Sequence, residues 1–217
     1  MNKIGFNVLA WSAVISDELM PIVERLKKTG YDGVECLIGS DDIKAYPRFG
    51  NHAKDLGLEV TSVFVLGKDE NPIDPSRSIR DKALDRIKWA IDRAHDMNAK
   101  IICGPFHSAH GIFSHHAPQE AEYARGAEVL HAAGDYAAGA CITLALEALN
   151  RFECYLCNIM NQLTGLIYRV SHPNVKAMFD THHANIEEKK NREAITKVAP
   201  ILAHVHISEN DRGTPGD

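Results

Sequence analysis

Long apolar runs are missing from this sequence. A membrane-spanning helix needs about 18–20 consecutive apolar residues, and no stretch of the 217 residues approaches that length. The N-terminus, Met-Asn-Lys-Ile-Gly-Phe-Asn-Val-Leu-Ala, carries one charge and lacks the apolar stretch and small-residue cleavage site of a signal peptide. We therefore expect a cytoplasmic protein with no membrane partner.

Positive charge and paired cysteines are also scarce. The net charge of −5 argues against a protein that binds a nucleic-acid backbone, because such proteins usually carry a basic surface. The five cysteines are an odd number in a chain of this length, which is not typical of a secreted disulfide framework, so we expect them to be reduced. Cys154 and Cys157 form a C-x-x-C pair, which suits either a zinc or redox role or simple filling of the core.

Short β-rich runs alternate with longer amphipathic runs along the whole chain. The strand candidates are Ile4–Ala10, Gly33–Ile38, Glu59–Leu66, Lys100–Gly104, Cys141–Glu147, Val175–Asp180 and Ala203–Ser208. Most are apolar at consecutive positions, as strands buried on both faces are. The helix candidates lie near residues 17–29, 42–56, 76–98, 118–139, 158–171 and 189–199. This alternation predicts a parallel sheet, either doubly wound or closed into a barrel.

The absence of a G-x-G-x-x-G after the first strand removes the main support for a dinucleotide-binding sheet. A barrel is favoured because the late strands each end in a residue able to do chemistry, as the mouth of a TIM barrel requires. We therefore predict an α/β fold, a (β/α)₈ TIM barrel, forming a single domain over residues 1–217. Only seven strands and six helices are visible, so we expect a barrel truncated after strand 7, with strand 8 and the last helices missing from the sequence.

Three of these strand ends carry possible metal ligands. Glu147, Asp180 and His206 are separated by 33 and 26 residues, close to the roughly 30 residues of one strand–helix unit. They should therefore meet at the carboxyl edge of three successive strands. Two carboxylates and an imidazole suit Mn²⁺, Mg²⁺ or Co²⁺, whereas Zn²⁺ usually prefers more nitrogen or sulfur. Alternatively, Asp180 caps a helix and His206 is a hydrogen-bonded core residue.

The same stretches resemble a known family. Three blocks carry the likeness: Leu-Glu147-Ala-Leu-Asn-Arg-Phe-Glu153, then Phe-Asp180-Thr-His-His183-Ala-Asn-Ile-Glu-Glu, then His-Val-His206-Ile-Ser-Glu-Asn-Asp-Arg212-Gly. The sequence resembles the xylose-isomerase-like TIM barrels, and within them the ketose 3-epimerases that act on D-tagatose, D-psicose or L-ribulose. The resemblance runs over the whole chain.

The resemblance implies a function and a set of site residues. Glu147, Asp180 and His206 would ligate one divalent ion, usually Mn²⁺ with Mg²⁺ or Co²⁺ accepted, and Glu147 would also act as one of two bases. The C1 to C3 oxygens of a ketose would be held by Glu153, His183 and Arg212. The reaction would be epimerisation at C3 through an enediolate, which needs a base on each face of C3. The family also suggests a homodimer or homotetramer.

One departure from the family pattern affects the expected activity. The family's second base, also its fourth metal ligand, is a glutamate on the eighth strand, about 30–35 residues beyond the last ligand. The chain ends 11 residues after His206, so we expect this glutamate to be absent and the chain as written to be a poor epimerase. The alternatives are another sugar isomerase or dehydratase of the same superfamily, or a catalytically silent metal or sugar binder. An endonuclease IV type of enzyme would need more ligands and a basic face.

Three further polar residues lie near the expected mouth. His107 and His110 follow the fourth strand, where they would either contact the far end of the substrate or form part of a hydrogen-bonded loop. Glu35 stands in the second strand, and we expect it to make a structural hydrogen bond rather than a substrate contact. His115 and His116 are expected to be solvated loop residues.

Overall fold

The strands form one parallel sheet in chain order. The computed structural model of the chain describes residues 2–213 and 216. The sheet has the order β1-β2-β3-β4-β5-β6-β7, and every neighbouring pair is parallel. The strands are β1 (Gly5–Asn7), β2 (Gly33–Leu37), β3 (Glu59–Val63), β4 (Ile101–Gly104), β5 (Thr143–Leu146), β6 (Val175–Asp180) and β7 (Leu202–His206).

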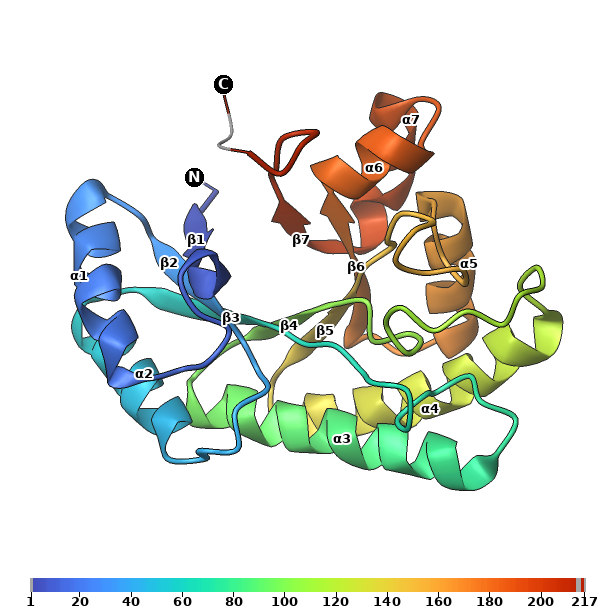
Figure 1. Cartoon of the computed structure of the whole chain (residues 1–217), viewed down its shortest axis with the longest axis horizontal. Helices are drawn as coiled ribbons and strands as arrows, with labels where there is room; N and C mark the ends of the chain where they lie inside the picture. The colour runs from blue at the N-terminus through green and yellow to red at the C-terminus, as the bar shows by residue number, and fades with distance from the viewer. Residues whose placement is uncertain (1, 214–215, 217) are drawn as a thin grey trace.

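Helices cover the outer face of this sheet, which curls into an open half-barrel (Figure 1). They are α1 (Met20–Thr29), α2 (Ala45–Asp55), α3 (Arg77–Asp96), α4 (Glu120–Gly139), α5 (Met160–Val170), α6 (Thr181–Glu187) and α7 (Asn191–Val198). Their apolar faces join the strands in a core with fully buried side chains such as Ile87, Leu130 and Leu144. No helix among the described residues is both long and apolar enough to cross a bilayer.

The curl of the sheet is strong enough to join strands that are not neighbours. Glu35 of β2 and His206 of β7 are 171 residues apart in sequence, yet Oε1 of Glu35 lies 2.7 Å from Nε2 of His206. The predicted parallel α/β barrel fold is therefore confirmed, and β7 is the last strand within the described part of the chain.

Several predicted boundaries were wrong for identifiable local reasons. The first strand stops at Asn7, because the Asn7 side chain accepts the Leu9 N–H and starts a 3₁₀ turn over Val8–Ala10. The fifth strand begins only at Thr143, since Cys141 takes a left-handed φ of 57° in the turn after α4. The short helix α6 was not predicted, because it follows β6 directly and its sequence has no clear apolar stripe.

Gly104 ends β4 in a conformation that only glycine adopts easily. Its φ is +130°, and a Cβ there would lie 2.4 Å from the carbonyl oxygen of Phe64. We predict that Gly104→Ala lowers the free energy of unfolding by about 1–3 kcal/mol, from backbone strain and overpacking. Urea-induced unfolding measures this change.

Gly67→Ala is the matched control, since a Cβ there meets nothing within 4 Å. It should change the free energy of unfolding by less than about 0.5 kcal/mol. Equal stabilities for the two variants would contradict the close packing of β4 against Phe64.

Candidate active site

Three of the sequence-predicted residues stand at the carboxyl edge of adjacent strands. Glu147 directly follows β5, and Asp180 and His206 are the last residues of β6 and β7. Glu147 and Asp180 are buried, and the His206 side chain is 22% exposed. Because neighbouring parallel strands end at the same edge, the spacing of about 30 residues brings these side chains to one place.

The Glu147 carboxyl group is buried without a strong partner. Its backbone is fixed, since its N–H donates to the Gly104 carbonyl (2.9 Å) and its carbonyl contacts Nε2 of His107 (2.9 Å). Among the described residues this carboxyl group makes no hydrogen bond, and its ion-pair partner is His183, whose Nε2 is 3.7 Å from Oε1. Burial raises the pKa of Glu147 to about 8; His206 lowers it, and Asp180 adds to the increase.

Asp180 uses its two oxygens for different purposes. Oδ1 accepts the backbone N–H groups of His182 (2.7 Å) and His183 (3.3 Å), which caps the N-terminus of α6. Oδ2 lies 3.5 Å from Nδ1 of His206. Burial raises the pKa of Asp180, but its interactions with His206, with His183 and with the His182 backbone N–H together outweigh burial, and the net shift is downward. The helix-cap interpretation is thus correct for one oxygen, while the other remains available to a ligand.

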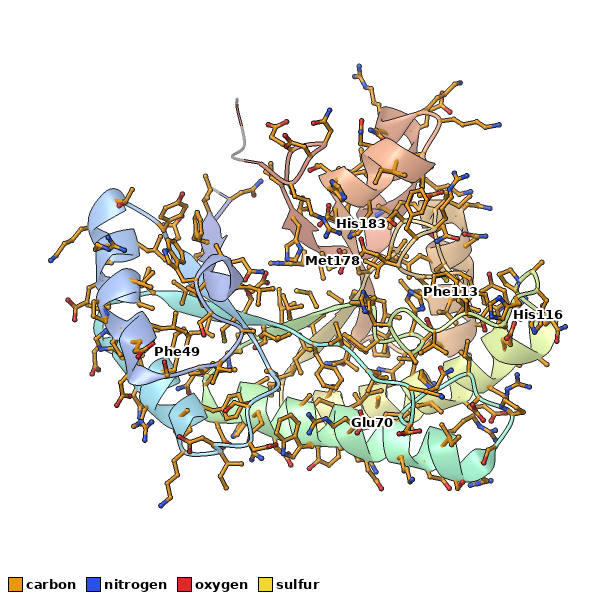
Figure 2. The ribbon with its side chains drawn as sticks, in the orientation of Figure 1. Phe49, Glu70, Phe113, His116, Met178 and His183 are labelled. Carbon is orange, nitrogen blue, oxygen red and sulfur yellow. The ribbon has the colours of Figure 1, made fainter. Side chains whose placement is uncertain are left out.

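The protonation of His183 follows from its hydrogen bonds. Its Nδ1 accepts from the Asn150 backbone N–H (3.1 Å), so this nitrogen carries no proton. The side-chain amide of Asn150 donates to the same nitrogen (3.0 Å). Burial also lowers the pKa of His183, which favours the neutral ring. A neutral His183 must therefore hold its proton on Nε2, the nitrogen that faces Glu147. Figure 2 shows His183 on α6, above Met178 of β6.

Glu153 and Arg212 form an ion pair at the outer side of this site. Nη2 of Arg212 donates to Oε1 of Glu153 at 2.5 Å, and the amide of Asn150 donates to the same oxygen at 2.8 Å. His110 lies 3.5 Å from the other oxygen. Asn150 thereby links His183 to the Glu153–Arg212 pair, so the three predicted sugar contacts belong to one hydrogen-bonded chain.

A second cluster lies on the other side of His206. Oε1 of Glu35 contacts Nε2 of His206 (2.7 Å), and Oε2 contacts Nε2 of His204 (2.9 Å) and Sγ of Cys103 (3.2 Å). Burial alone would raise the pKa of Glu35, but the hydrogen bonds to His204 and His206 hold it well below its usual range. The expected structural role of Glu35 is confirmed.

The donor groups at these strand ends fit a divalent metal ion. The ligand atoms of Glu147, Asp180 and His183 lie within 4.8 Å of one another, and so do those of Glu35, Cys103, His204 and His206. His206 thus belongs to the second group, with Glu35. Its contact with the first group is the approach of its Nδ1 to Oδ2 of Asp180. Carboxylate and imidazole donors suit a moderately hard cation, which would also offset the uncompensated negative charge around Glu147.

Other histidines and the cysteine pair have structural roles. His107 is fully buried and its Nε2 contacts the Glu147 carbonyl, which favours the second of its two expected roles, a hydrogen-bonded loop residue. His116 is exposed, and Figure 2 shows it far from His183, near the start of α4. Cys154 and Cys157 are buried and not disulfide-bonded, in agreement with core filling.

Sequence reasoning missed the residues that hold the predicted ones in place. Asn150 fixes the tautomer of His183, and its position between Glu147 and Glu153 was the only available signal. Arg151 donates two hydrogen bonds to the Glu187 carboxylate, which joins the first of the three sequence blocks to the second. His204 lies two residues before His206, and the period of two along a strand could have placed both side chains on one face of β7.

Comparison with known proteins agrees with this geometry. Residues 23–217 match the family described as the xylose isomerase-like TIM barrel. The chain is 29% identical to D-psicose 3-epimerase of Agrobacterium fabrum over 99% of this chain and 75% of that protein. It is 32% identical to L-ribulose 3-epimerase of Methylomonas sp., over 98% of this chain and 74% of that protein.

A solved structure of L-ribulose 3-epimerase superposes with a TM-score of 0.93 at 27% identity, covering all of this chain and 73% of that one. This chain belongs to the xylose isomerase-like TIM barrel family. Within that family it falls in the ketose 3-epimerase group, as its sequence blocks indicated.

The raised pKa of Glu147 predicts a pH-dependent stability of the metal-free protein. Its folded pKa, about 8, lies above the unfolded value of 4.5, so the folded state binds this proton more tightly. The free energy of unfolding should therefore fall as pH rises from 4.5 to 8. Glu147→Gln removes this penalty and should gain stability relative to the unaltered chain between pH 5 and 9. The expected gain is a few kcal/mol, since one pKa unit corresponds to about 1.4 kcal/mol.

Thermal or urea unfolding in the presence of a chelator measures the difference at each pH. Glu18→Gln is the control, because Glu18 is an exposed carboxylate in the 3₁₀ turn that precedes α1. A Glu147→Gln difference that stays constant across this pH range would show that Glu147 is ionised in the folded protein.

Proposed function

We propose that this protein epimerises free ketoses at C3, in the cytoplasm, with the help of one divalent metal ion. The observation that carries this proposal is the convergence of Glu147, Asp180 and His206 at one edge of the sheet, with His183 beside them. The named activities of the related D-psicose and L-ribulose 3-epimerases support the same reaction. The sequence has no glycine-rich phosphate-binding loop, which favours a sugar without phosphate.

Glu147, Asp180 and His206 would hold the metal. His206 is preferred over His183 because Nε2 of His183 carries a proton, whereas Nδ1 of His206 faces Asp180. When bound, the ion would supply Lewis-acid stabilisation of the negative charge that develops on the sugar oxygens. Mn²⁺ is the ion we propose, with Mg²⁺ or Co²⁺ as substitutes.

Glu147 would act as a base toward the proton on C3. The carbonyl at C2 acidifies this proton, and its removal gives an enediolate. A carboxylate held beside C3 can take up this proton and return it. Inversion also requires a second base on the opposite face of C3. Of the two bases, exchange of the C3 proton with solvent requires only Glu147.

The remaining predicted residues would orient the sugar. His183 presents an N–H toward Glu147, so it can donate a hydrogen bond to a sugar oxygen held there. Glu153 and Arg212 offer an acceptor and a donor at the outer side of the site. Their mutual ion pair would open or share its hydrogen bonds when a sugar hydroxyl arrives. Loss of Asn150 would disturb both His183 and Glu153.

Deuterium exchange in D₂O tests the proposal. D-psicose and D-fructose, incubated with the protein and Mn²⁺, should gain deuterium at C3, as followed by NMR. Glu147→Gln should slow this exchange by a factor of about 10²–10⁴, the usual contribution of a general base. A chelator should abolish it, and the Glu18→Gln control should behave like the unaltered chain.

The position of the label separates the alternatives. Exchange at C1 instead of C3 would indicate a 1,2-isomerase of the same family. Exchange at C3 together with interconversion of the two sugars would show complete epimerisation. Metal binding without exchange at either carbon would contradict the proposed activity and leave a metal-binding protein.

A further inference from the structure

Glu35 is the most highly connected buried side chain near the site, and it is not one of the proposed ligands. It is 4% exposed and lies on β2. Its carboxylate contacts side chains from β1, β3, β4 and β7, and these partners are Asn7, Thr61, Cys103, His204 and His206. One carboxylate therefore ties together strands from both edges of the sheet.

Both carboxylate oxygens of Glu35 accept hydrogen bonds. Oε1 accepts from the Asn7 amide at 3.0 Å and contacts Nε2 of His206 at 2.7 Å. Oε2 accepts from the Thr61 hydroxyl at 2.8 Å and from Sγ of Cys103 at 3.2 Å. An ionised carboxylate only accepts hydrogen bonds, so Nε2 of His206 must carry a proton.

This contact fixes which nitrogen of His206 is presented to the site. With its Nε2–H directed to Glu35, the ring turns Nδ1 toward Asp180, whose Oδ2 is 3.5 Å away. Metal-bound histidines commonly donate their other N–H to a carboxylate, which sets the ring orientation and strengthens the ligand. Resting on the function proposed above, we propose that Glu35 is a positioning residue that holds His206 so that Nδ1 is aimed at the divalent ion.

A competing arrangement places the ion inside the Glu35 cluster. Glu35, Cys103, His204 and His206 also have ligand atoms within 4.8 Å of one another, and a thiol with two imidazoles suits a softer ion. In the structure, however, the other three of these donors are already hydrogen-bonded to Glu35. Moving an ion there would exchange those hydrogen bonds for ligand bonds and make Glu35 a ligand.

Cobalt distinguishes the two arrangements by spectroscopy. Co²⁺ titrated into the full chain reports its affinity, and a thiolate ligand would add an intense sulfur-to-metal band in the near ultraviolet. We expect binding without that band. We expect Glu35→Gln to bind Co²⁺ about 10–100-fold more weakly, the usual cost of losing such a supporting carboxylate.

Two variants serve as controls. Glu59→Gln makes the same chemical change at an exposed carboxylate on β3, which pairs with Lys3, and should bind like the unaltered chain. Cys103→Ser should also keep its affinity, because the thiol is not a ligand in our proposal. A sulfur band that disappears in Cys103→Ser would place the ion in the Glu35 cluster and overturn the proposal.

A measurement on the unaltered chain avoids dependence on the folding of a variant. Long-range ¹H–¹⁵N spectra of the histidine rings in the Mg²⁺-loaded protein should show His206 with a proton on Nε2 and none on Nδ1. The opposite pattern would overturn the proposal. Full affinity in Glu35→Gln would defeat this inference alone, whereas a chain that binds no Co²⁺ would defeat the proposed function as well.

Discussion

The site depends on buried negative charge that the fold only partly compensates. Glu35, Glu147 and Asp180 place three carboxyl groups around the imidazole of His206. Glu35 and Asp180 have hydrogen-bond donors and stay ionised, whereas Glu147 has none at close range and its pKa rises to about 8. A divalent cation is the simplest group that would balance this charge.

The class of fold could be predicted because buried parallel strands have a simple sequence pattern. Runs such as Cys141–Glu147 are apolar at consecutive positions and end in a polar residue, so both the strand and its edge are visible. Boundaries were less predictable, because they are set by local hydrogen bonds such as that between Asn7 and Leu9. The helix α6 was hidden because Thr-His-His-Ala-Asn-Ile-Glu has no clear apolar stripe.

For the site, the sequence could predict which residues stand at the strand ends, but not how their side chains contact one another. Spacing brought Glu147, Asp180 and His206 to one edge, and the family resemblance singled out His183 from its neighbour His182. Sequence could not show that Glu35 contacts His206, since this pairing spans 171 residues and arises from the curl of the sheet. Nor could it show which His183 nitrogen carries the proton, which the Asn150 backbone decides.

The most direct test of this account is the position of a bound metal ion. A crystal of the protein grown with Mn²⁺ and measured by anomalous scattering would locate it. Our account predicts one ion in contact with Glu147, Asp180 and Nδ1 of His206, while Nε2 of His206 remains hydrogen-bonded to Glu35. An ion bound instead by Cys103 and His204, or by Nε2 of His183, would contradict it.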